Sequence, residues 1–198
     1  MLSYEEKIDL FNDIENKIDK CCLCPLSEEC KPISGFGNIK NSILFVRDCP
    51  EFEEIRTNNV WSSPTARLFN KILHAAHINC NKIYSTYLIH CRPLNNKILA
   101  EDINNCSNYL NDIINIIEPK IIVTCGRHSL HYFLGNNKNI NNSRGIFFNK
   151  EYSYGTTLIY PLNHPTSMIK LPSIRKKEMF DDLNLLFLKM IELKIIVE

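Results

Sequence analysis

Short apolar runs alternate with amphipathic segments along most of the chain, and this alternation strongly constrains the fold. The predicted strands are residues 42–46, 83–89, 120–125 and 156–161. The predicted helices are residues 3–20, 64–77, 100–117, 126–134 and 172–194. Continuous apolar strands joined by helices are typical of a parallel sheet covered on both faces. We therefore predict an α/β fold, a three-layer α/β/α sandwich with a central four-stranded parallel sheet.

The connections between these elements indicate where a ligand would bind. In a parallel sheet, ligands bind beyond the carboxyl ends of the strands. This rule selects four loops, at residues 47–61, 90–94, 126–127 and 163–170. Two further segments are predicted to be irregular, a glycine-punctuated turn at 33–38 and a polar loop at 136–143.

The overall charge is nearly balanced, with 23 Lys and Arg against 22 Asp and Glu in 198 residues. Nucleic-acid-binding proteins often carry a basic excess, so any contact with DNA has to come from a local patch or from backbone amides. No stretch is long and apolar enough to span a membrane, and the N-terminus lacks the features of a signal peptide. We expect an intracellular, non-secreted monomer with one domain over residues 1–198, of which residues 1–40 form an N-terminal helix and arm.

Nine cysteines are present, and thiols inside cells rarely form a disulfide framework. Cys21 and Cys24 form a CxxC pair ahead of the first predicted strand, whereas Cys91 and Cys106 lie at the two ends of a strand-to-helix connection. Four thiolates suit either zinc or an iron–sulfur cluster. Cys22 and Cys30 remain possible substitutes in this ligand set. The other cysteines stand alone near apolar stretches, as buried core cysteines often do.

The order of motifs resembles that of the iron–sulfur uracil-DNA glycosylases of the family 4 type. The matching stretches are residues 21–26, 33–38, 43–50, 60–66, 90–93, 101–106, 125–127, 144–145 and 163–165. The resemblance implies a uracil-DNA glycosylase-like fold, DNA as partner, and a 4Fe–4S cluster, in preference to zinc, on Cys21, Cys24, Cys91 and Cys106. It also implies a monofunctional hydrolase of base-excision repair that extrudes uracil or another deaminated base from DNA and breaks its N-glycosidic bond.

The same resemblance assigns three residues to the reacting base. Asp48 takes the position of the family's catalytic acidic residue, and His164 takes that of a late histidine that donates to the base carbonyl. Trp61 takes the position of an aromatic residue that stacks on the base. Each has a structural alternative, because an Asp after a strand is often a cap, a lone Trp is often core, and a loop His is often only hydrogen-bonded.

Three further residues are predicted to contact DNA. Gly126 opens a helix whose first amides could bind a phosphate. Met168 or Ile169 is predicted to wedge into the base stack where the base leaves, and Lys170 begins a short basic run beside them.

The sequence departs from the family mainly in the predicted pocket. Arg47 and Glu51 replace two glycines, so Glu51 is expected to reach toward the base. Tyr87 replaces an asparagine that reads the base edge, and its hydroxyl is a larger and less versatile partner than an amide. These changes leave open a catalytically altered or inactive DNA-binding protein on the same scaffold. The chemistry of the sequence alone leaves a second alternative, a zinc-stabilised α/β protein of unrelated function.

Overall fold

The computed structural model describes residues 2–170 and 172–195. Within them, one mixed sheet has the strand order β1-β3-β2-β4-β6-β5. The strands are β1 (Gly35–Gly37), β2 (Ile43–Arg47), β3 (Tyr84–Tyr87), β4 (Ile121–Cys125), β5 (Phe148–Tyr152) and β6 (Gly155–Leu162). The four central strands pair in parallel, which agrees with the predicted core of the sheet. The two edge strands pair antiparallel to their neighbours.

Neither edge strand is predicted from the sequence. Strand β1 is only Gly-Phe-Gly, and this sequence is typical of a turn. The backbone nevertheless requires a glycine at position 37. Its φ is 128°, and a Cβ there would lie 1.8 Å from the carbonyl oxygen of Ile83. Strand β5 alternates half-buried with exposed residues and has a polar centre, so it lacks the continuous apolar run of a central strand.

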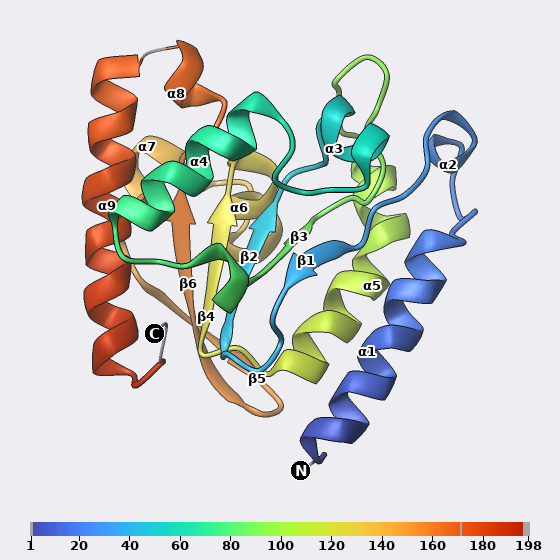
Figure 1. Ribbon diagram of the computed structural model, residues 1–198, viewed down its shortest axis with the longest axis horizontal. Helices are drawn as coiled ribbons and strands as arrows, with labels where there is room; N and C mark the ends of the chain where they lie inside the picture. Colours follow the sequence, from blue (N-terminus) through green and yellow to red (C-terminus); the bar gives the residue numbers. More distant parts are fainter. Residues whose placement is uncertain (1, 171, 196–198) are drawn as a thin grey trace.

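Helices cover both faces of the sheet, as predicted (Figure 1). They are α1 (Tyr4–Asp19), α2 (Leu26–Glu29), α3 (Phe52–Thr57), α4 (Pro64–Ala75), α5 (Ala100–Ile117), α6 (Arg127–Leu134), α7 (Ile140–Ser143), α8 (Ser167–Lys170) and α9 (Pro172–Glu192), with a 3-10 turn η1 (Cys80–Lys82). Short helices α3 and α7 replace parts of two predicted loops. No helix of the described residues has the length and apolar character needed to cross a membrane.

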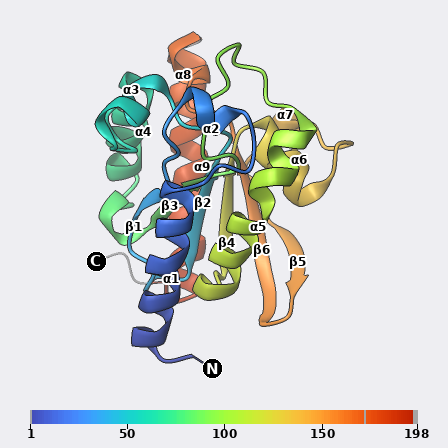
Figure 2. The same cartoon turned by 90° about the vertical axis from the view of Figure 1, so that its right-hand side faces the viewer.

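Two apolar layers hold these helices on the sheet. Helices α1 and α5 lie side by side on one face, where their inward side chains pack on Leu44, Val46 and Ile122 (Figure 2). Helices α4 and α9 pack on the other face against Phe45 and Val123. Consecutive strand residues thus point to opposite faces, and both faces are buried.

The parallel pairing brings four strand ends to one edge of the sheet. Asp48, Gly126 and Asn163 directly follow β2, β4 and β6, and His90 lies three residues beyond β3. Helices α3 and α8 and the loop before α5 stand at this same end (Figure 1). This edge is therefore where the predicted site residues can meet.

Candidate active site

Asp48 is a buried carboxylate held by the start of α6. Its Oδ1 accepts the amide of Ser129 at 2.8 Å, and its Oδ2 accepts Nδ1–H of His128 at 3.1 Å. Gly126 makes room for it, because a Cβ on Gly126 would lie 2.5 Å from Oδ2 and the φ there is 133°. The first amides of α6 therefore hold Asp48, which differs from the phosphate contact predicted for Gly126.

The surroundings of Asp48 favour its charged form. Burial raises the pKa of this carboxyl, but the hydrogen bond from His128, the interaction with His164 when that ring is protonated and the amide of Ser129 outweigh burial. The pKa of Asp48 therefore lies below its ordinary value. A buried carboxylate that stays ionised can stabilise a cation or orient a water molecule.

His164 follows β6 and is held in one tautomer. The amide of Thr166 donates to Nδ1 at 3.2 Å, and the Thr166 hydroxyl lies 2.8 Å from the same nitrogen. Because Nδ1 accepts a hydrogen bond, the ring proton of the neutral imidazole is on Nε2. Burial lowers the pKa of His164, although the nearby charge of Asp48 acts in the opposite direction. The side chain is thus a neutral donor at neutral pH.

Asp48 and His164 line one cleft of about 600 Å³ at the strand ends. The other lining residues come from the segment after β2, the loop between β3 and α5, the start of α6 and the segment that contains α8, and several are basic. They are Cys49, Glu51, Arg92, Asn96, Ile98, Arg127, His128, Thr166 and Lys170. Glu51 and Lys170 therefore lie where the sequence places them, beside the two predicted catalytic residues.

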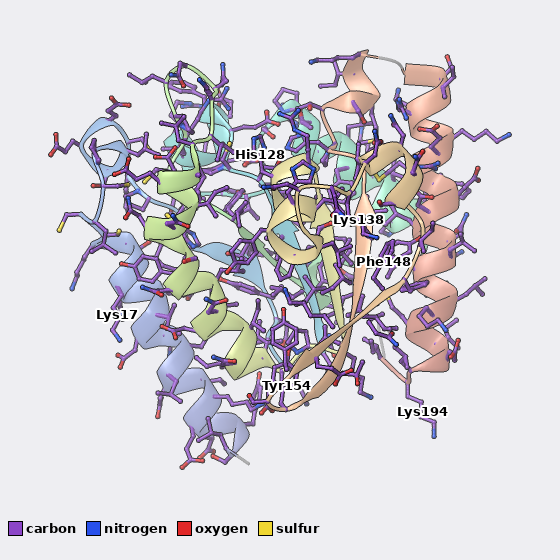
Figure 3. All side chains as sticks on the ribbon, turned by 180° about the vertical axis from the view of Figure 1, so that it is seen from behind. Lys17, His128, Lys138, Phe148, Tyr154 and Lys194 are labelled. Atoms are coloured by element: carbon purple, nitrogen blue, oxygen red, sulfur yellow. The ribbon has the colours of Figure 1, made fainter. Side chains whose placement is uncertain are left out.

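His128 is a site residue that the sequence reading misses. It lies at the start of α6, at the strand-end side of the molecule (Figure 3), and donates to Asp48 while lining the cleft. Its only signal in the sequence is its position just after the Gly126–Arg127 loop. A histidine at such a position has no distinctive spacing to its partner, because Asp48 is 80 residues away.

Tyr87 does not line this cleft, in contrast to its predicted contact with the base. Its side chain is fully buried, and its hydroxyl donates to Oε2 of Glu54 at 2.9 Å and accepts from Arg47. Arg47 and Glu54 form a buried, bidentate ion pair with N–O distances of 2.9 and 2.7 Å. The replacements Arg47 and Tyr87 thus belong to one internal network centred on Glu54.

Two other predicted contact residues are also packed inside. Trp61 is partly buried against Phe69, with ring centroids 6.4 Å apart, and it is not among the residues that line the cleft. Met168 is fully buried in the core under α9, so its side chain is not available as a wedge. Its neighbour Ile169 is 54% exposed and keeps the position predicted for a wedge.

The predicted cysteine ligands lie on two segments, one after α1 and one running from the loop after β3 into α5. Cys91 and Cys106 are buried, and Cys21 and Cys24 are partly buried. Burial raises the pKa of the Cys106 thiol to about 11. Cys30 accepts the amide of Arg92 at 3.3 Å. Across residues 2–170 and 172–195, no group of three or more Cys, His, Asp or Glu side chains is already arranged to hold a metal ion.

Comparison with known proteins identifies relatives over most of the chain. The family model of the uracil DNA glycosylase superfamily matches residues 34–187. A type-4 uracil-DNA glycosylase from Saccharolobus solfataricus is 34% identical over 180 residues, covering 86% of this chain and 81% of the relative. One from Sulfurisphaera tokodaii is 30% identical over 176 residues, covering 85% and 80%. One from Thermotoga maritima is 28% identical over 165 residues, covering 82% and 84%.

Proposed function

Because the chain belongs to the uracil DNA glycosylase superfamily, we propose that it hydrolyses the N-glycosidic bond of an extruded deaminated base in DNA, with uracil as the first candidate. The observation that carries this proposal is the pairing of an ionised Asp48 with a neutral His164 in one cleft with a basic lining. An anionic group and a neutral donor are the two groups that this reaction needs at the sugar and at the leaving base.

Asp48 acts on the sugar side of the reaction. When the N-glycosidic bond breaks, its electron pair leaves with the base and positive charge develops on the deoxyribose ring. The Asp48 carboxylate stabilises that charge and orients a water molecule toward the sugar carbon. The water adds as hydroxide, and its proton is released to the carboxylate or to solvent. His128 and the amide of Ser129 fix the carboxylate for this role.

His164 acts on the base side. Its Nε2–H donates to a carbonyl oxygen of the base, where negative charge accumulates as the bond breaks. Thr166 occupies Nδ1 and so fixes the orientation of the ring. A neutral donor stabilises the leaving anion without having to give up a proton. The exposed Lys170 is assigned to a DNA phosphate, so no amine takes part covalently and the reaction is monofunctional.

The basic side chains of the cleft are proposed to bind the DNA backbone. Arg92, Arg127 and Lys170 line the cleft from the loop before α5, the start of α6 and the end of α8. Contacts of Lys and Arg with phosphates provide most of the sequence-independent affinity for DNA. A local cationic cleft of this kind fits a chain whose total charge is close to zero.

A 4Fe–4S cluster is proposed to link Cys21 and Cys24 to Cys91 and Cys106, with zinc as the alternative. Four thiol side chains from two separate segments are a donor set that fits such a group. The cluster would supply a cross-link between the N-terminal arm and the loop before α5. Cys30 lies close enough to this set to remain a possible substitute ligand.

The test is a panel of oligonucleotides that each carry one deaminated base, in single- and double-stranded form. Incubation with the protein followed by alkali should cleave the strand at uracil or at another base of the panel, because an abasic site is alkali-labile. Formation of no abasic site from any of these bases would refute the proposed function. The wild-type panel also decides which base is preferred.

A further inference from the structure

Leu94 is the most exposed of the large apolar side chains in the part of the chain that the structure describes, at 76%. It lies in the loop between β3 and α5, which begins just after Cys91. This loop, light green in Figure 1, rises above the strand ends on the β3 side, whereas α8 rises above them on the β6 side. A single exposed apolar side chain needs no explanation by itself, so the position of Leu94 relative to the cleft decides whether it has a role.

The loop holds Leu94 outward in an ordered turn. The amide of Asn96 donates to the carbonyl of Pro93 at 3.0 Å, which makes Leu94 the second residue of a four-residue turn. The Arg92 guanidinium donates to the side chain of Asn96 across the base of this turn. The Arg92 amide is in turn bound to the sulfur of Cys30 at 3.3 Å. The side chain is therefore presented by a structured loop.

Leu94 stands beside the basic cleft. Arg92 and Asn96, its neighbours in the turn, line the cleft on one side. On the other side, Lys170 lines the cleft next to Ile169, which is 54% exposed. Two exposed apolar side chains thus lie next to opposite rims of one cleft whose basic lining matches the charge of DNA.

We propose that Leu94 inserts into the base stack of duplex DNA on the strand opposite the extruded base, and that duplex DNA is therefore the preferred substrate. This inference rests on the proposed function. Extruding a base from a duplex leaves a gap in one strand and an unpaired base in the other. Ile169 would fill the gap, and Leu94 would cover the unpaired base, as apolar side chains do when they wedge between base steps. A single strand has no opposite base for Leu94 to contact.

The experiment compares wild type with Leu94→Ala on duplex and single-stranded oligonucleotides that carry a stable abasic analogue, by fluorescence anisotropy. We expect affinity for the duplex to fall about tenfold and affinity for the single strand to change by less than about twofold. Leu188→Ala is the matched control, because Leu188 is 62% exposed on α9 and does not line the cleft. It should leave both affinities unchanged.

An unchanged affinity of Leu94→Ala for the duplex, or an equal loss on both oligonucleotides, would overturn the inference. Release of each base of the deaminated-base panel is measured in parallel on the same two strand forms. Wild type that binds the duplex through Leu94 but releases no base would refute the proposed function and leave the Leu94 contact standing. The binding measurement therefore tests the Leu94 contact, and the base-release measurement tests the proposed function.

Discussion

Asp48 and His164 obtain their protonation states from different neighbours. Asp48 is charged because donors at the start of α6 outweigh its burial, whereas His164 is neutral because burial disfavours the imidazolium. Each pKa lies below the ordinary value for its residue type. The ionised carboxylate and the neutral imidazole are therefore both favoured at neutral pH.

The expected pH profile follows from these directions. Activity requires ionised Asp48 and neutral His164, and both conditions are lost only when pH falls through the lowered pKa values. On the proposed mechanism, the rate of base release at saturating DNA should decrease only below the ordinary pKa of histidine, about 6.5. A profile that already falls by half at about pH 6.5 would show that His164 titrates at its ordinary pKa, contrary to this account.

Tyr87→Phe tests the internal role of Tyr87. The variant removes one buried donor to Glu54, so the free energy of unfolding should fall by about 1 kcal/mol. Because the hydroxyl does not line the cleft, the order of preference among the bases of the panel should be unchanged. A changed preference, measured as a ratio of rates, would mean that Tyr87 reads the base after all.

Sequence reasoning identifies some of these residues and misplaces others. Asp48, Glu51 and His164 could be predicted, because strand ends in a parallel sheet converge and their motif positions are distinct. The buried positions of Met168 and Tyr87 could not be predicted, because an apolar or aromatic side chain near a strand end can point either into the core or toward the cleft. His128 was missed because its contact with Asp48 depends on how α6 begins.

At the scale of elements, Glu54 ties four segments together around the cleft. Its carboxylate accepts from Arg47 at the end of β2 and from Tyr87 at the end of β3. It also accepts the Ser63 hydroxyl at the start of α4 at 2.9 Å and the Glu51 amide before α3 at 2.9 Å. Asp48 and Glu51 lie on the segment that this carboxylate secures.

Glu54→Gln should destabilise the protein strongly. The change leaves the buried charge of Arg47 without a counter-charge, and breaking a buried pair in this way costs about 3 kcal/mol or more. Chemical denaturation of the variant measures the loss. Glu53→Gln is the control on the same helix, because Glu53 pairs with Arg56 in solvent and should change stability by less than about 1 kcal/mol. Equal effects of the two substitutions would contradict the role given to Glu54.

The elements themselves were predictable to different degrees. The four central strands and five long helices follow from continuous apolar runs and amphipathic spacing. The short helix α3 could not be predicted in this way. Its stabilising group is the carboxylate of Glu54, which is buried, whereas a glutamate in a polar stretch of sequence is expected at the surface. Strand β5 is held mainly by its pairing with β6 at the edge of the sheet. Its sequence therefore lacks the continuous apolar run by which a central strand is recognised.

At the scale of the whole molecule, the two predicted cysteine pairs lie on segments that are distant in sequence. The N-terminal arm carries Cys21 and Cys24, and the α5 region carries Cys91 and Cys106. The loop between Cys91 and Cys106 also contributes Arg92 to the cleft and presents Leu94. A cross-link at this position would hold the DNA-facing loop on the body of the protein.

Purification without oxygen tests that cross-link. Wild type should be brown and contain iron and sulfide, and Cys106→Ser should lose the colour and the iron. Cys80→Ser should keep both, because Cys80 lies in the 3-10 turn η1, apart from the predicted ligand set. Cys22→Ser and Cys30→Ser show whether either takes part. A colourless wild-type protein with stoichiometric zinc would replace the iron–sulfur cluster by a zinc site.

The central claim is that Asp48 and His164 break an N-glycosidic bond in DNA, and a single-turnover assay with a uracil-containing oligonucleotide tests it most directly. Free uracil and an abasic strand should appear together with wild type. Asp48→Asn should lower the rate by about 100-fold or more while DNA affinity stays within about threefold, since the carboxylate acts on the transition state. Equal rates for wild type and Asp48→Asn, or no release of base by wild type, would contradict the account.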